Sequence, residues 1–368
     1  MPLPGPMEIG RFLEKSLPRD QKEKDSRLVE ELVGLPLSVV EQVIAEASVA
    51  GEKAEWREFF QEKRLSYLEQ HFRGALEFHH PGLTLDDVGG YRALKEHIRK
   101  RKTVFQEGAS SLLKGILLTG FPGTGKSTLA KAIAGSLDLP LVRLNVSMLY
   151  SSFVGVSEAR MDEVLRTLEA FSGRGMVLWL DEYEKMFASD REGRTDGGVG
   201  SRVSAIFLHW ISERKPPGLY LVATANSLNL EPALWRRGRF EQVFWLDPPA
   251  REERLEILGI ILKRRGMNPE NIDLALIAQK TEMFVGAELE NLVDTVLVES
   301  KSRGLEPNTL VFLDCLKDQA PQIRLFEESF QEARDSVLRF AALANSTDLK
   351  ESRLATVRVL KPRKEDSR

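Results

Sequence analysis

The sequence holds few of the residues that mark secreted, metal-rich or membrane-spanning proteins. Its 368 residues include one cysteine, Cys315, so no disulfide can form within the chain and a cysteine-rich metal site is excluded. There are five histidines and no H-E-x-x-H sequence, which argues against a zinc-protease centre. The first residues show no basic region followed by an apolar segment, and no apolar run is long enough to span a bilayer. We therefore expect a cytoplasmic protein with no membrane partner.

An excess of one charge is also missing. The 52 lysines and arginines nearly balance the 55 aspartates and glutamates, which gives a net charge of −3. A bulk attraction to nucleic acid or to anionic lipid is therefore not expected. The basic run Lys95–Lys102 could contact nucleic-acid phosphates, but its acidic surroundings and the lack of interleaved aromatic residues favour a solvated helix face.

What the sequence does contain is a phosphate-binding loop. The residues Gly120–Thr128 read Gly-Phe-Pro-Gly-Thr-Gly-Lys-Ser-Thr and fit the pattern G-x-x-x-x-G-K-[ST]. An apolar run precedes them and a helical pattern follows, which is the strand–loop–helix context that this motif needs. Loop amides and the positive end of the new helix bind an anion, Lys126 reaches the β- and γ-phosphates, and Ser127 offers a hydroxyl to Mg²⁺. The expected nucleotide contacts in the loop are Gly120, Pro122, Gly123, Thr124, Gly125, Lys126, Ser127 and Thr128.

The chain around this loop predicts an α/β fold. Apolar strands alternate with helical segments, and the expected strands are Ile116–Thr119, Leu141–Asn145, Met176–Leu180, Leu219–Thr224 and Gln242–Trp245. Strands separated by helices in this way form a parallel sheet that is covered on both faces. We therefore expect a five-stranded parallel sheet in an αβα arrangement, with ligands beyond the carboxyl ends of the strands.

Four regions are expected along the chain. Residues 1–82 read as a helical N-terminal segment, with two short helices interrupted by Gly34 and Pro36 and a third helix over Trp56–Phe72. Residues 83–249 hold the sheet, which Asp247-Pro248-Pro249 ends as a turn. Residues 250–345 read as a small helical lid, and residues 346–368 as a tail. The lid helices are expected at Arg251–Arg264, Ile272–Thr281, Ala287–Ser302 and Glu327–Ala342.

Polar residues follow two of the expected strands. Asp181 and Glu182 come directly after Met176–Leu180, where the first can hold Mg²⁺ opposite Ser127 and the second can orient the attacking water. Asn226 follows the next strand, where it can hydrogen-bond the γ-phosphate or the water. Alternatively, the acids are a charged loop and Asn226 is a turn former. Two further candidates, Arg236 and Arg239, could offset phosphate charge within the chain or from a neighbouring subunit, or form a solvated basic turn.

Together these motifs resemble the AAA ATPases proper, the group that includes the proteasomal ATPases, FtsH, valosin-containing protein and spastin-like enzymes. The resemblance covers about residues 83–303. Leu85–Gly90 looks like the segment that opens the family's ATPase domain, Gly120–Thr128 like its Walker A and Leu180–Glu182 like its Walker B. Asn226 is at the sensor-1 position, and Val285–Leu289 looks like the sensor-2 segment of this clade.

The resemblance implies ATP or ADP and Mg²⁺ as ligands and a homo-oligomeric ring, typically a hexamer. Val88 and Gly89 would then lie at the adenine, and Gly286 and Ala287 would close on the nucleotide from the sensor-2 segment. It further implies Lys126, Glu182, Asn226, Arg236 and Arg239 as catalytic residues, the last two as arginine fingers that reach into the next subunit. Ser127 and Asp181 would hold the metal.

A family-like pore loop is expected at Phe153-Val154-Gly155, where such motors carry an aromatic residue that grips a polypeptide; an apolar surface loop is the alternative. Val156 stands where many relatives have Glu, and Ile261 where they often place His. The narrower resemblance is to stand-alone single-ring AAA proteins of bacteria, cyanobacteria and plastids.

Three functions are open at this point. The first is ATP-driven remodelling, unfolding or disassembly of a protein client whose identity the sequence does not give. The second is a nucleotide-switched assembly chaperone or scaffold that does not thread its partner. The third, a nucleic-acid motor, is disfavoured by the near-neutral charge.

Overall fold

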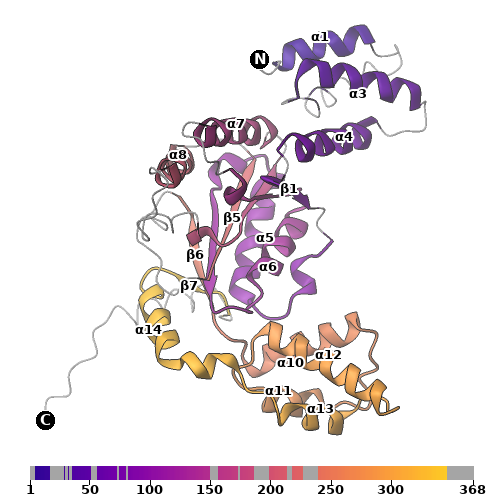
Figure 1. The fold of residues 1–368 in the computed structure, drawn as a ribbon, viewed down its shortest axis with the longest axis vertical. Coiled ribbons are helices and arrows are strands. Elements are labelled where there is room, and N and C mark those ends of the chain that lie inside the picture. The colour runs from indigo at the N-terminus through magenta and orange to yellow at the C-terminus, as the bar shows by residue number, and fades with distance from the viewer. Residues whose placement is uncertain are drawn as a thin grey trace, which may run out of the picture.

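The computed structural model describes residues 5–16, 29, 32, 35–50, 56–72, 74–79, 82–149, 156–172, 175–185, 199–213, 218–226 and 239–345. Within this part of the chain, a helical N-terminal unit lies at one end, a sheet with helices on both faces in the middle, and a helical lid at the other end (Figure 1). Among the described helices, none combines the length and the hydrophobicity that crossing a membrane needs.

The sheet has seven strands in the described residues, in the order β1-β3-β4-β5-β2-β6-β7. The central five are parallel and match the predicted strands within one residue at each end, which confirms the α/β class. Two more strands extend the predicted sheet: β1 pairs antiparallel with β3, and β7 pairs parallel with β6. The bounds are β1 (Leu76–His79), β2 (Gly115–Gly120), β3 (Leu141–Leu144), β4 (Met176–Leu180), β5 (Leu219–Ala225), β6 (Gln242–Leu246) and β7 (Ala342–Leu343).

Helices cover both faces of the sheet because neighbouring strand residues point to opposite sides. In β2, Ile116 and Leu118 pack in the cluster that contains α5 (Arg92–Gln106) and α6 (Lys126–Leu137), whereas Leu117 packs in the cluster of α7 (Val156–Phe171) and α8 (Val199–Glu213). Both clusters are nearly free of solvent, and each fully buried aliphatic side chain contributes about 1.5–3 kcal/mol. The loop after β2 is therefore anchored by a strand with two buried faces.

The N-terminal unit comprises α1 (Pro6–Ser16), α3 (Leu37–Ala50) and α4 (Trp56–His71). Pro36 directly precedes α3, and its carbonyl accepts from the amides of Val39 and Val40 in the first turn of that helix. The prediction of a wholly helical segment up to residue 82 was wrong at residues 76–79, which form β1. Gly74, at φ +79°, turns the chain after α4, and the following residues pair with the otherwise open edge of β3.

The lid contains α10 (Arg251–Arg264), α11 (Leu274–Lys280), α12 (Gly286–Ser302) and α13 (Thr309–Leu316) around a core of its own. The bounds of α10 coincide with the prediction. Asp273 and Asn308 cap α11 and α13 with their side chains. Short 3₁₀ helices lie at Leu85–Asp87, Ser110–Leu112, Val146–Leu149 and Gln322–Phe326.

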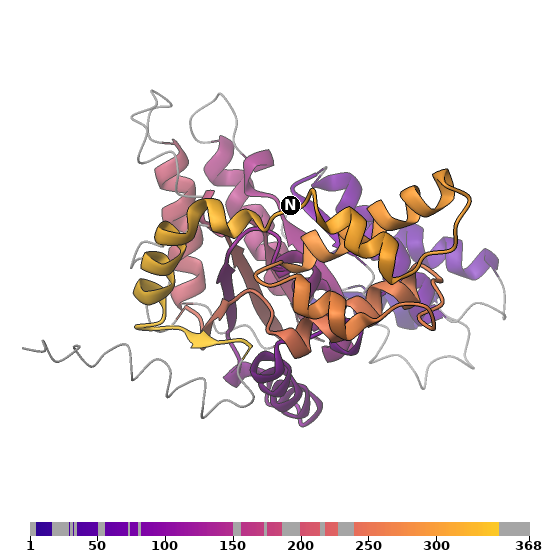
Figure 2. The same cartoon turned by 90° about the horizontal axis from the view of Figure 1, so that it is seen from below.

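The chain then returns from the lid to the sheet. The expected helix Glu327–Ala342 ends earlier, as α14 (Glu327–Val337), and residues 342–343 form β7 instead. The expected lid range, 250–345, includes α14, whose buried Phe330 joins the core of the sheet and packs against Trp245 of β6 at 5.8 Å between ring centroids. Seen from below, α14 (gold) lies apart from the orange lid helices (Figure 2).

Candidate nucleotide site

The phosphate loop occupies the turn between β2 and α6. Gly120 is the last residue of β2, Pro122 and Thr124 lie in the turn, and α6 begins at Lys126, so that Ser127 and Thr128 are in its first turn. Gly123 and Gly125 have φ values of +82° and +83°, a conformation that favours glycine. The residues that the sequence predicted as a phosphate cradle therefore surround the amino end of one helix.

Lys126 is 6% exposed and lies over this loop. Its ammonium donates to the carbonyls of Gly120 and Phe121, both at 2.9 Å. Burial lowers the pKa of Lys126 to about 8, against the opposing charges of Glu184 and Asp181. A bound phosphate could replace these carbonyls as the partner of the cation and would favour its charged form.

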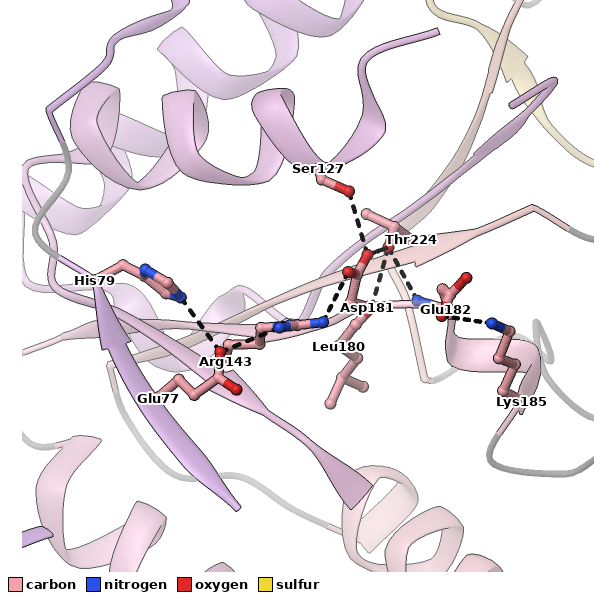
Figure 3. Close-up of polar contacts among 9 residues, drawn as sticks. All are labelled: Glu77, His79, Ser127, Arg143, Leu180, Asp181, Glu182, Lys185 and Thr224. Carbon is pink, nitrogen blue, oxygen red and sulfur yellow. Dashed lines mark hydrogen bonds and ion pairs between the residues drawn. The ribbon is translucent and has the colours of Figure 1, made fainter. Parts of the chain in front are cut away.

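Asp181, just after β4, is the centre of the polar contacts (Figure 3). Its Oδ1 accepts from Thr224 Oγ1 at 2.7 Å and from Ser127 Oγ at 3.3 Å, while its Oδ2 accepts from Arg143 at 3.1 Å. The structure thus brings the two predicted metal-binding residues together. A hydroxyl and a carboxylate are hard oxygen donors that fit Mg²⁺, with water and phosphate oxygens to complete the coordination.

Glu182 points away from this pair toward Lys185, whose ammonium lies 2.7 Å from its carboxylate. The backbone of Glu182 has φ +50°, which is uncommon for a residue with a side chain, and its amide donates to Thr224 Oγ1 at 3.3 Å. Asn226 follows β5, and its backbone amide donates to Glu184 at 2.9 Å. The predicted water-orienting and sensor-1 residues therefore both lie at the carboxyl edge of the sheet, as does Asp181.

Two further segments close around the loop. The amide of Ala287, in the first turn of α12, donates to the carbonyl of Gly123 at 3.1 Å, with Gly286 beside it. Gly89 lies against the lid helix α10, where a Cβ would come within 2.7 Å of Ile257, and the neighbouring Val88 packs on the cluster that contains α5 and α6. The two segments that the resemblance assigned to the nucleotide are thus in contact with the loop or with the lid.

The remaining predicted residues lie elsewhere. Arg239 precedes β6, at the amino end of the strands, and its Nε donates to Ser212 of α8 at 3.3 Å. Because β2 and β6 run parallel, the length of a five-residue strand, about 16 Å, separates this end from the phosphate loop. Arg236 and the pore-loop residues Phe153, Val154 and Gly155 fall outside the described part of the chain.

Sequence reasoning missed three polar residues at the site. Thr224 is hidden inside an apolar strand, Arg143 is a single charge in Leu-Val-Arg-Leu, and Glu184 is one acid in a charged run. For Thr224 and Arg143, the only signal in the sequence was a polar residue inside an otherwise apolar strand. No signal distinguished Glu184 from the other acids of its run. Their contacts with Asp181 and Asn226 depend on strand register, which the sequence does not display.

A parallel sheet, a glycine-rich loop at a helix start, a strand-end carboxylate and a helical lid together define a nucleotide-binding domain of the P-loop class. Residues 116–248 match the model of the ATPase family associated with various cellular activities, abbreviated AAA. The chain therefore carries an AAA ATPase domain, which confirms the predicted family and its ATPase class.

Relatives agree with this assignment. The AAA domain-containing protein ycf46 of Gracilaria tenuistipitata var. liui is 36% identical over 252 residues, which are 67% of this chain and 50% of the relative. The ycf46 protein of Pyropia yezoensis is 34% identical over 310 residues, 80% of this chain and 61% of the relative. The ATP-dependent zinc metalloprotease FtsH of Thermus thermophilus is 30% identical over 249 residues, 65% of this chain and 39% of the relative. The chain thus spans only part of the length of each relative.

Proposed function

We propose that this chain binds Mg²⁺-ATP at residues 120–128 and hydrolyses it at the interface between subunits of a ring, to remodel a protein client. The observation that carries the ATPase part is the 3.3 Å contact between Ser127 and Asp181. It places a hydroxyl from the helix that begins at the phosphate loop beside a carboxylate at a strand end. That is the pair of oxygen donors that a magnesium–nucleotide complex requires.

Each residue has a role that follows from its place. Loop amides and Lys126 hold the phosphates, and Ser127 and Asp181 hold Mg²⁺, which when bound polarises the γ-phosphate. Glu182 orients the attacking water and takes up its proton, for which its carboxylate must leave Lys185. Asn226, fixed through its amide by Glu184, lies where it can sense the γ-phosphate. The product is ADP and inorganic phosphate.

The position of Arg239 supports catalysis between subunits. It lies at the end of the sheet opposite its own phosphate loop, so it is better placed to serve a neighbour than its own site. With Arg236, it would offset the charge that develops on the phosphate of the next subunit. A closed ring lets every site receive such arginines, and six subunits are the number that the family resemblance implies.

The client is proposed to be a polypeptide gripped by Phe153-Val154-Gly155 in the central channel. The alternative is a scaffold or assembly chaperone that switches partners as its lid opens and closes with the bound nucleotide, without threading a polypeptide. A nucleic-acid motor ranks third because the net charge is −3. The single cysteine fits a reducing, cytoplasmic compartment.

The ATPase proposal is tested by Glu182→Gln. The variant should bind ATP as the parent does but hydrolyse it about 10²–10⁴ times more slowly, because the group that accepts the proton is lost. Glu213→Gln, the same chemical change at an exposed position of α8, should leave turnover unchanged. Parental turnover in Glu182→Gln would contradict the assignment.

The ring proposal is tested by mixing two inactive variants. Arg239→Ala retains an intact phosphate site, and Glu182→Gln retains an intact arginine. If the arginine acts on the neighbouring site, mixed rings should recover ATPase activity that neither variant shows alone. Mixing that restores nothing, in rings shown to exchange subunits, would argue against catalysis between subunits.

The threading motor and the switching scaffold differ in whether client remodelling needs the pore-loop residue Phe153 and ATP hydrolysis. A pull-down with ATP-trapped Glu182→Gln should retain the client in either case. Phe153→Ala should then spare ATPase activity but abolish remodelling of that client if threading is correct. If ATP-trapped Glu182→Gln still supports the partner's function, the switching scaffold is favoured instead.

A further inference from the structure

Arg143 connects the proposed metal site to the strand that sequence reasoning missed. One guanidinium nitrogen donates to Asp181 Oδ2 and the other to Glu77 Oε2 of β1, each at 3.1 Å (Figure 3). The guanidinium also lies over the ring of Trp179, 5.1 Å from its centroid. Arg143 is thus held on three sides by groups from β1 and β4.

The register of the sheet builds this cluster. Glu77 lies directly opposite Arg143 in the β1–β3 pair, and Trp179 is the partner of Arg143 in the β3–β4 pair. The three side chains therefore share one face of the sheet. A one-residue slip of β1 would turn Glu77 to the other face and leave Arg143 without that carboxylate.

The two oxygens of Asp181 have different partners. Oδ1 faces the hydroxyls of Thr224 and Ser127, whereas Oδ2 faces Arg143. With a donor on each oxygen, the carboxylate cannot rotate freely, and Oδ1 stays directed toward Ser127, where the metal would be held. Fixing a ligating carboxylate by an outer hydrogen bond is a common way to raise metal affinity.

Glu77 solves an electrostatic difficulty that Arg143 would otherwise create. A guanidinium paired with Asp181 alone would neutralise the charge that attracts the cation. Because Arg143 is shared with Glu77, the cluster of two carboxylates and one guanidinium keeps one net negative charge beside Ser127. His79 Nε2 lies 3.8 Å from the same Glu77 oxygen, at the far side from Asp181.

We propose that Arg143 and Glu77 are positioning residues for the Mg²⁺-binding carboxylate of Asp181, so that β1 is part of the nucleotide site; this rests on the proposed binding of Mg²⁺-ATP. They orient Oδ1 toward Ser127 and keep its charge available, without contact to the nucleotide.

The test measures binding of the ATP analogue AMP-PNP by calorimetry, in EDTA and over a series of Mg²⁺ concentrations. Arg143→Ala should raise the Mg²⁺ concentration for half-maximal tightening about 10–100-fold, while affinity in EDTA stays as in the parent. Arg143→Lys, which keeps the charge but loses the planar fork, should recover part of this loss. Glu77→Gln should shift the Mg²⁺ requirement in the same direction, by less than Arg143→Ala.

Arg265→Ala is the matched control. Arg265 is 33% exposed, against 31% for Arg143, and it also bridges two carboxylates, Glu290 and Asp294, but within the lid. Its removal should leave the Mg²⁺ requirement unchanged.

An unchanged Mg²⁺ requirement in Arg143→Ala would overturn the inference, and a lower one would show that Arg143 competes with the cation instead. If the parent itself shows no Mg²⁺-dependent tightening, the proposed function fails separately. Arg143→Ala is judged unfolded if it loses both AMP-PNP binding in EDTA and a thermal unfolding transition. In that case Arg143→Lys and Glu77→Gln provide the test. A parental Mg²⁺ requirement in both of these variants overturns the inference.

Discussion

The amide of Ala287 donates to the carbonyl of Gly123 at 3.1 Å, so the lid helix α12 contacts the phosphate loop directly. Val285, one residue before α12, lies on the same glycine. A change in the position of the lid must therefore alter the surroundings of the loop, and a change in the loop must be felt by the lid.

Gly123→Ala should weaken nucleotide binding about tenfold. Gly123 has φ +82°, and a Cβ there would come within 2.8 Å of Val285 Cγ2, so the loop must shift or the lid must move away. The backbone penalty alone is about 1–2 kcal/mol. Gly108→Ala provides the control, because Gly108 has φ +75° but open space around its Cβ position. AMP-PNP affinity by calorimetry should fall in the first variant alone; equal affinities would contradict the contact.

Lys185→Ala should raise the hydrolysis rate, by up to about fivefold. Lys185 holds the carboxylate of Glu182 at 2.7 Å in a pair whose side chains are 66% and 41% exposed. Such exposed pairs contribute at most about 1 kcal/mol, which is about fivefold in rate. Turnover at saturating ATP checks this, and a clear fall would show that Lys185 itself contributes to the reaction.

Phe330→Ala should cost about 3–5 kcal/mol of unfolding free energy, because a fully buried aromatic side chain is removed. Phe330 also packs against Phe121 of the phosphate loop, at 6.1 Å between ring centroids, so AMP-PNP affinity should fall as well. Phe312→Ala in the lid core removes an equally buried ring. Denaturant unfolding should show similar losses for both, with the larger loss of affinity in Phe330→Ala; the reverse order would exclude a role of α14 at the loop.

Glu241→Gln should reduce stability at neutral pH by about 3 kcal/mol, because the carboxylate of Glu241, which is 15% exposed, accepts from His97, Arg101 and Tyr220. Burial raises the pKa of Glu241, but hydrogen bonding from His97 and the charge of Arg101 outweigh it, so the pKa lies below the usual value of 4.5.

The folded protein binds the Glu241 proton less tightly than the unfolded chain, so this stabilisation is complete above pH 4.5 and is lost as pH falls through the lower folded pKa. Urea unfolding at pH 7 and below pH 4 should therefore show a gap between parent and variant that shrinks with acid. A gap that stays constant or grows would contradict the assignment, and exposed Glu213→Gln should show none.

Local signals explain what the sequence predicted well. The turn Asp247-Pro248-Pro249 ends one strand and frees the next residues to start a helix, so the bounds of α10 coincide with those expected. Every residue of the central strands β2, β4 and β5 is buried, so the prediction did not have to decide which face of these strands meets the core. The phosphate loop and the acids after β4 were found because the residues that define each motif are consecutive in the sequence.

The misses all depend on contacts between distant segments. β1 is four residues long with one fully buried position, so its pattern is too short to distinguish a strand from a helix end. Helix α14 is amphipathic, but its own sequence does not indicate which core it packs on. Its position is set by contacts with Trp245 and Asp247, which lie some 85 residues earlier in the chain. Arg143 needed the register of two strand pairs to be placed beside Asp181.

Both borders of the sheet are closed by segments from outside its central part, β1 before it and β7 after it. A shortened version that starts at residue 83 or stops at residue 321 would expose a row of backbone donors and acceptors along β3 or β6, which invites self-association. Any excised catalytic piece intended for crystallisation or kinetics should therefore begin before Leu76 and extend beyond Leu343.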